Sequence, residues 1–173
     1  MEASLKSMNM RSEELSARVR SAFGHVHFPS HRGIRAAMAM DDWITNEDAL
    51  AAITAEKDIH GEWWQIPFSE LRQCALGLSY LDAAGLEFYL PAYLNMALAD
   101  LKYEDFRLTL QLLDPGLAKD DLCFRGGLSA VAGTRKEVCV EFLQLLMERV
   151  YSQDPLSIRA DIERILEHPF WKV

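Results

Sequence analysis

Apolar residues recur every three to four positions along much of this chain, and capping residues, glycines and prolines separate the runs. The clearest runs cover residues 15–26, 71–81, 138–150 and 158–166. This recurrence places apolar side chains on one face of an α-helix, and such faces must be buried against one another. The sequence therefore predicts a mostly α, compact multi-helix fold.

Residues that favour helix ends set the expected boundaries. Ser12 is the expected N-cap of the first helix, with residues 1–10 frayed before it. A second helix is expected from Gly33 to Ile44, and Asn46 can cap a third. Later helices are expected to begin near Ser69, Pro91, Thr134 and Pro155, and Phe88–Leu90 is expected to be extended before Pro91.

Residues 106–125 carry a different pattern. Phe106, Leu108, Leu110 and Leu112 alternate with polar residues, and a period of two is typical of a strand. The turn-forming residues 114–116 follow, and Leu122–Phe124 could form a return strand. A short β-hairpin over residues 106–125 is therefore an alternative to helix here.

The length and composition indicate one globular domain over residues 1–173. Half of the 173 residues are hydrophobic and a quarter are charged, with no internal repeat or linker. No apolar run is long enough to span a bilayer, and the N-terminus lacks the apolar segment of a secretory signal. Cys74, Cys123 and Cys139 form no CxxC pair, so we expect reduced thiols and a cytoplasmic location.

The charge of the chain is concentrated in its middle. The net charge is −8, and residues 36–121 alone carry −11, against +3 before them and zero after them. Phosphate contacts need Lys and Arg, so this distribution argues against nucleic acid as a partner. An acidic surface attracts a basic protein surface, although solvated acidic residues that only aid solubility are the alternative.

Few residues offer a pattern for chemistry. His25, His27 and His31 have spacings that could hold a metal ion such as zinc. They straddle a predicted helix end and Pro29, however, so their rings need not converge, and histidines at a helix terminus are the alternative. Cys74 and Cys139 lie on apolar helix faces, where inert thiols are the usual case. The sequence has no Walker lysine and no G-x-G-x-x-G motif, so we expect no cofactor. We also expect no metal, because the three histidines lack a converging geometry.

Residues 63–93 carry a series of motifs in a fixed order. Trp64-Gln65-Ile66-Pro67 precedes a helix that ends in Leu78–Ala83, and Phe88–Tyr93 follows Gly85. This order resembles a bacterial family catalogued only as a domain of unknown function, with the pattern W-x-x-I-P, F-L-D-x-x-G and F-Y-L-P-A-Y. Tyr80 stands where that family usually has Phe. The resemblance implies a bacterial origin and a shared fold, and it brings no activity, cofactor or catalytic residue.

The same region supplies candidates for partner binding, because Trp and Tyr are enriched at binding hot spots. Core packing is the alternative role for these aromatic residues. The aromatic candidates are Trp63, Tyr89 and Tyr93, and the acidic candidates are Asp82, Glu87, Asp120 and Asp121.

We therefore expect a non-enzymatic protein-binding module. Its concrete form would be a bacterial immunity or antitoxin protein that occludes a cognate toxin through an acidic, aromatic surface. The alternative is a small enzyme of unknown reaction, metal-dependent through His25, His27 and His31.

Overall fold

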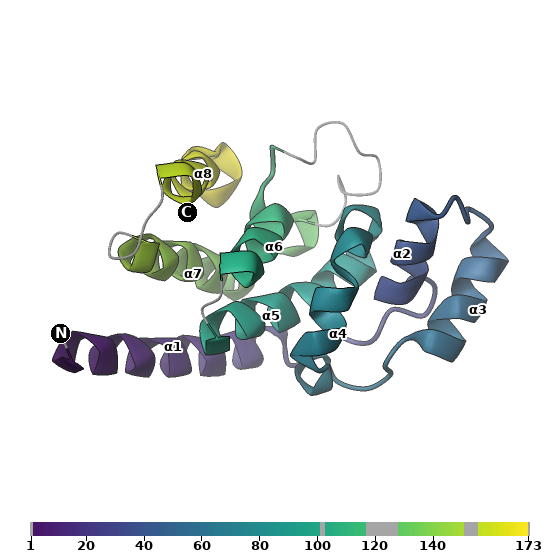
Figure 1. Cartoon of the computed structure of the whole chain (residues 1–173), viewed down its shortest axis with the longest axis horizontal. Coiled ribbons are helices and arrows are strands. Elements are labelled where there is room, and N and C mark those ends of the chain that lie inside the picture. The colour runs from purple at the N-terminus through teal and green to yellow at the C-terminus, as the bar shows by residue number, and fades with distance from the viewer. Residues whose placement is uncertain (1, 101–102, 117–127, 151–155, 173) are drawn as a thin grey trace.

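The computed structural model describes residues 2–100, 103–116, 128–150 and 156–172 (Figure 1). Its α-helices are α1 (Glu2–Phe23), α2 (Ile34–Asp41), α3 (Glu47–Lys57), α4 (Phe68–Gln73), α5 (Ala83–Asp100), α6 (Tyr103–Leu113), α7 (Thr134–Val150) and α8 (Leu156–Glu167). Short 3₁₀ helices are η1 (Trp63–Gln65), η2 (Ala75–Tyr80), η5 (Leu128–Ala130) and η6 (Pro169–Trp171). No strand occurs within these described ranges, and the prediction of a mostly α fold is confirmed.

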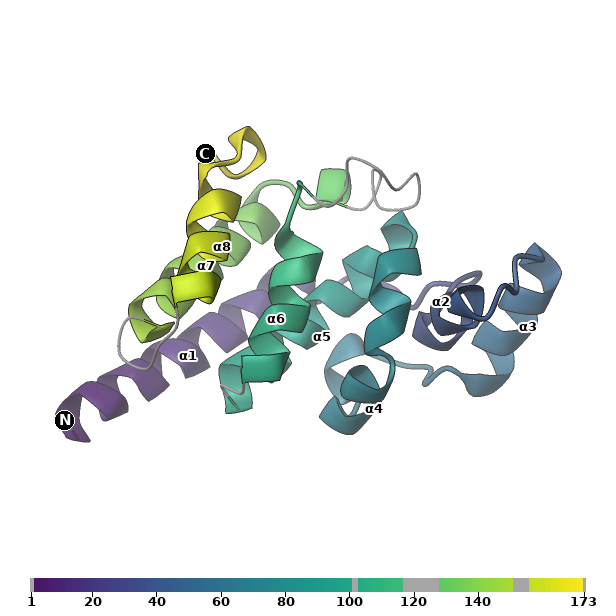
Figure 2. The same ribbon diagram turned by 45° about the horizontal axis from the view of Figure 1, so that its top comes forward.

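Helix α5 is the centre of the molecule. Buried side chains surround its axis, and α1, α4, α6, η1 and η5 all contact it. Figures 1 and 2 show α1 running alongside both α5 and α7, with α8 on the outer side of α7. A helix that is apolar all round must be enclosed by other elements, and α5 meets this condition.

The expected break before Pro91 is wrong, because α5 continues through this proline. A proline inside a helix costs roughly 3 kcal/mol, since it removes one hydrogen bond and its ring clashes with the preceding turn. Phe88, Tyr89 and Leu90 are all buried on α5, and burial of one such side chain contributes about 1.5–3 kcal/mol. Packing of the preceding turn therefore outweighs the local effect of Pro91.

The first arm of the alternative hairpin is also helical, because α6 covers Tyr103–Leu113. Asp105, Phe106, Thr109 and Leu113 are buried at helical spacing along one face of α6. Two of these four residues, Asp105 and Thr109, are polar. A pattern read from the apolar residues alone therefore misses half of this face and has a period of two, which is misleading here. The expected return strand at residues 122–124 lies outside the described residues.

The first helix begins earlier than expected. Residues 2–10, which were expected to be frayed, are helical in α1, so the helix begins about ten residues before the expected N-cap. Ser12 is not an N-cap, because its hydroxyl donates to Met8 O at 3.0 Å within the helix. That hydroxyl also accepts a hydrogen bond from Arg149 of α7. Contacts with α7 thus support the early turns of α1.

The single helix expected over residues 71–81 is wrong, because α4 ends at Gln73 and the 3₁₀ helix η2 follows it. Several other boundaries agree with the sequence to within a few residues. The Asn46 side chain accepts from Ala49 N at 3.0 Å and caps α3, as expected. Helix α7 begins at Thr134, also as expected. Helix α2 ends at Asp41, earlier than the expected Ile44, and this shift exposes the loop between α2 and α3. Pro155 lies outside the described residues.

Candidate partner-binding surface

The three aromatic candidates are internal, so their expected role as partner anchors is wrong. Trp63, Tyr89 and Tyr93 are each no more than 1% exposed. The Trp63 indole donates to Phe23 O at 3.1 Å, and the Tyr93 hydroxyl donates to Leu71 O at 2.6 Å. These rings therefore fill the core and satisfy backbone carbonyls there, which is the alternative role stated for them.

Tyr89 takes part in a network that fixes the start of α2. Its hydroxyl accepts a hydrogen bond from Ile34 N at 3.1 Å and donates to Asp58 Oδ1 at 3.3 Å. Asp58 Oδ1 also accepts from Arg35 N at 2.9 Å. Gly33, the N-cap of α2, has no side chain, so a carboxylate from the end of α3 supplies the cap instead. Burial raises the pKa of the Asp58 carboxyl above its usual value.

The acidic candidates are used inside the chain or lie outside the described residues. Asp82 accepts a hydrogen bond from Gly85 N at 2.8 Å at the start of α5. Glu87 forms an ion pair with Arg135 of α7. Asp120 and Asp121 lie outside the described residues. Asp82 and Glu87 therefore each have a role inside the fold, as a cap and as an ion-pair partner.

The histidines do not form a cluster. His25, His27 and His31 are exposed, and His25 Nε2 lies 2.7 Å from Arg135 Nη2, which donates to it. Within the described part of the chain, no group of three His, Cys, Asp or Glu residues could hold a metal ion.

Two thiols are buried. Burial is the main cause that raises the pKa of Cys74 to about 12, and it also raises the pKa of Cys139. Both are free cysteines. Their burial agrees with the expectation that they lie on packed helix faces. A thiol whose pKa is raised in this way has little thiolate at neutral pH, so neither is an activated nucleophile.

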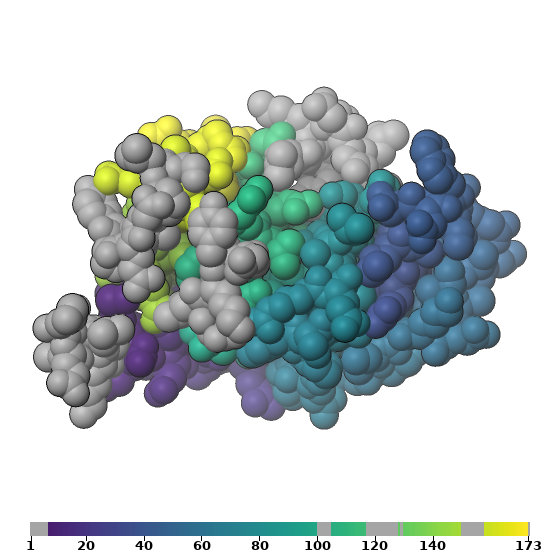
Figure 3. All heavy atoms as spheres, viewed as in Figure 1, coloured from purple at the N-terminus to yellow at the C-terminus, as the bar shows by residue number. Residues whose placement is uncertain are grey.

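The most exposed large apolar side chain among the described residues is Trp43, at 89%. It lies in residues 41–48, which run from the last residue of α2 to the first two residues of α3, and all eight of these residues are exposed. We call this segment the Trp43 loop. Figures 1 and 3 show that α2, α3 and the connection between them form one end of the molecule, coloured blue.

The backbone of Trp43 is in the left-handed region, with φ of 64°. Trp43 N donates to Met40 O at 3.0 Å, and Ile44 N donates to Ala39 O at 3.0 Å. This pair of bonds defines a Schellman motif at the end of α2, and Trp43 occupies the position that is usually glycine. A side chain with a Cβ is strained in this conformation, and glycine is not.

Acidic residues flank this tryptophan in the sequence. Between Arg35 and Lys57 the sequence contains five acidic residues and no basic one. They are Asp41, Asp42, Glu47, Asp48 and Glu56. Asp41 accepts a hydrogen bond from the Tyr80 hydroxyl at 3.1 Å, and Glu47 pairs with Arg32 at 2.9 Å. The loop thus combines one exposed aromatic residue with exposed acidic residues, of which Asp41 and Glu47 also have partners inside the chain.

Sequence reasoning missed Trp43 because it extended the second helix to Ile44, which would have placed this residue inside a helix. A signal was present, however. Asn46 caps the next helix, so the chain must leave α2 only a few residues earlier. No glycine is available there, and the turn must therefore use a residue that is poorly suited to it.

A comparison with known proteins identifies the family of this chain but assigns it no function. The model of a family described as "Family of unknown function (DUF6714)" matches residues 11–168, so the chain belongs to that family. This confirms the resemblance to an uncharacterised family. No curated protein matches the chain, and no solved structure matches it. No helix in the described ranges is long and apolar enough to cross a membrane.

Proposed function

We propose that this member of DUF6714 is a protein-binding module, and that the Trp43 loop contacts the partner. The observation that carries the proposal is Trp43 itself, 89% exposed at a position where glycine is the favoured residue. A strained residue with no internal packing is usually retained for a role outside the fold. Tryptophan is also among the residues most enriched at binding hot spots.

The partner has a basic surface around an apolar pocket. Asp42 and Asp48 are exposed beside Trp43, and their charges would steer a basic surface toward the loop. Insertion of the indole into a pocket would then slow dissociation. The net charge of −11 over residues 36–121 also supports a positively charged partner surface.

The concrete form that we propose is a bacterial immunity or antitoxin protein that acts in the cytoplasm and occludes a cognate toxin. Toxins that act on nucleotides or nucleic acids often have a basic cleft, which an acidic loop with an aromatic tip would complement. A toxin gene next to the gene for this protein would support this form. A metal-dependent enzyme would need His25, His27 and His31 around one centre, and their placement does not favour it.

The test compares three forms of the full chain as bait in lysate of the source cell. Trp43→Asn removes the indole and keeps a residue that tolerates the left-handed conformation. Met10→Gln is the matched control, because Met10 is 55% exposed on α1. We expect the wild type and Met10→Gln to capture the same basic protein, and Trp43→Asn to lose it.

Kinetics with the captured partner then separate the two contributions. Trp43→Asn should increase the dissociation rate, while Asp42→Asn should slow association at low salt and have little effect at high salt. Glu13→Gln removes an exposed charge from α1 as the control. An acidic partner, association independent of ionic strength, or unchanged binding by Trp43→Asn would contradict the proposal.

A further inference from the structure

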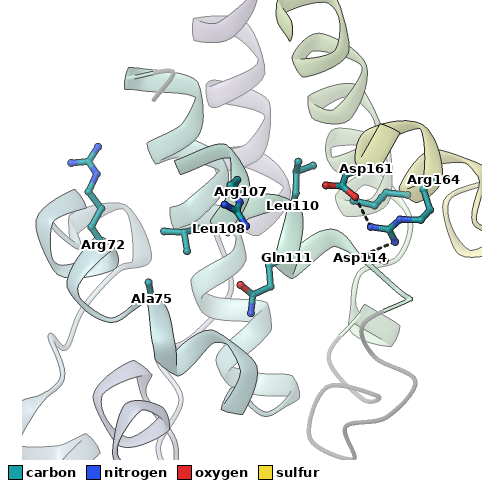
Figure 4. Close-up of a pocket in the computed structure, with 10 residues that line it drawn as sticks. Arg72, Ala75, Arg107, Leu108, Leu110, Gln111, Asp114, Asp161 and Arg164 are labelled. Atoms are coloured by element: carbon teal, nitrogen blue, oxygen red, sulfur yellow. Dashed lines mark hydrogen bonds and ion pairs between the residues drawn. The ribbon is translucent and has the colours of Figure 1, made fainter. Parts of the chain in front are cut away.

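A groove crosses the outer face of α6, with α4 and η2 on one side and α8 on the other (Figure 4). Its volume is about 810 Å³. Sites for small organic ligands typically measure roughly 300–1,000 Å³. Arg107, Leu108 and Gln111 of α6 form the floor, Arg72 and Ala75 form one wall, and Arg164 is on the other.

Two of the three arginines in this groove are held by carboxylates. Arg72 donates to buried Asp105 at 2.9 and 2.6 Å. Arg164 donates to Asp114 at 2.6 Å and to Asp161 at 3.0 Å. These carboxylates offset the charges of both walls.

Arg107 differs from its two neighbours. It is exposed, and it makes no ion pair or hydrogen bond with any described residue. Figure 4 shows it on the floor, between Arg72 and Arg164. The groove therefore presents one available guanidinium beside the half-buried apolar side chains of Leu108 and Ala75.

We propose that this groove binds an amphipathic organic anion. A carboxylate, sulfonate or phosphate group pairs with the guanidinium of Arg107, which can bind such a group through two parallel hydrogen bonds. The apolar part of the ligand lies on Leu108 and Ala75. Because Asp114 and Asp161 repel an anion at the α8 wall, the charged group lies on the side of Arg72. This site is separate from the Trp43 loop, and its ligand is an anion, whereas the partner proposed for that loop is basic.

The test uses two fluorescent probes of similar shape, anilinonaphthalene sulfonate and its uncharged parent N-phenylnaphthylamine. Arg107→Gln should weaken binding of the sulfonate by roughly tenfold or more, the loss expected for a charged hydrogen bond. It should leave the affinity for the uncharged probe unchanged. Arg107→Lys keeps the charge without the planar fork, so its sulfonate affinity should be intermediate.

Two control variants locate the probe. Arg18→Gln removes an arginine on α1 that does not line the groove, and Trp43→Asn removes the exposed indole. Neither should alter the affinity for the sulfonate. The proposal is overturned if Arg107→Gln leaves sulfonate binding unchanged, if it weakens both probes equally, or if Trp43→Asn abolishes binding.

Discussion

Trp43 has a conformational strain that burial of its side chain does not offset, since the residue is 89% exposed. A left-handed conformation costs a residue with a Cβ roughly 1–2 kcal/mol, and asparagine tolerates it better. We therefore expect Trp43→Asn to raise the free energy of unfolding by up to about 1 kcal/mol. Urea denaturation would measure this, with Met10→Gln expected to stay within about 0.5 kcal/mol of the wild type. A clear loss of stability in Trp43→Asn would show that the indole packs on the protein.

Asp58 and Glu70 should affect stability with opposite pH dependence. Burial raises the pKa of Asp58 above 3.8, so its stabilising contribution decreases as pH rises from 3.8 through the folded-state value. The hydrogen bond from Arg35 lowers the pKa of Glu70 below 4.5, so its contribution is complete above 4.5 and is lost as pH falls through the folded-state value.

The opposite pH dependence can be tested by subtracting the free energy of unfolding of each variant from that of the wild type. For Asp58→Asn, we expect this value to decrease as the pH rises through the usual carboxyl range, because the buried carboxylate becomes charged. For Glu70→Gln, the free energy of unfolding of the wild type minus that of the variant should increase over the same pH range. Parallel curves for the two variants would show that the assigned environments are wrong.

The identity of a residue does not determine whether it contacts a partner or the core. Trp63 and Tyr93 have the composition of hot-spot residues, but their polar atoms bond to backbone carbonyls inside the fold. The sequence gives no sign of such long-range hydrogen bonds. Trp43 could have been identified only by predicting the end of α2 within one or two residues, and helix ends are the least certain part of any such prediction.

An ion pair with one fully buried member connects α4 with α6. Asp105 is that member, and Arg72, its bidentate partner, is half-buried. Removal of one member of a buried pair typically costs about 3–5 kcal/mol, because it leaves an uncompensated charge. We expect Arg72→Met to show a loss of this size in chemical denaturation, and Arg72→Met/Asp105→Leu to recover most of it.

The control is Arg11→Met. Arg11 and Glu148 form an ion pair with both side chains about half exposed, and such surface pairs contribute about 0–1 kcal/mol. An equal loss in Arg11→Met and Arg72→Met would contradict the role assigned to burial. Failure of the double substitution to recover stability would mean that Arg72 acts through its other contacts.

The apolar part of the buried face of α1 was predicted well, whereas the buried face of α6, which mixes apolar and polar residues, was not. The stripe of α1 through Leu15, Val19 and Phe23 is buried as expected. In α6 the buried face includes Asp105 and Thr109, which the pattern counts as solvent-facing. A polar residue is buried only where a distant element supplies its partner, as Arg72 does, and a periodicity in one segment contains no information on that partner.

Apolar packing joins most of the molecule into one core. The buried cluster includes Val19 of α1, Ile34 of α2, Leu94 of α5 and Trp171 of η6. A continuous core predicts cooperative unfolding, and urea transitions followed by far-UV circular dichroism and by tryptophan fluorescence should coincide. Trp63 and Trp171 report from different elements, so separate transitions would contradict the expectation of one domain over residues 1–173.

Helix α3 is the least integrated helix in this core. Its buried Leu50 is not part of the main apolar cluster, and the helix packs chiefly on α2. Polar contacts hold its end, where Gly33 N donates to Thr54 Oγ1 at 2.9 Å and Arg35 N donates to Asp58 Oδ1. Elements with few buried apolar contacts open locally at a lower free energy than the global unfolding value.

We therefore expect amides of α3 to exchange with solvent faster than those of α5, measured by native-state hydrogen exchange. Binding of the partner at the Trp43 loop should slow exchange in α3 most. Protection of α3 equal to that of α5 in the unbound protein would show that its polar contacts suffice to join it to the core.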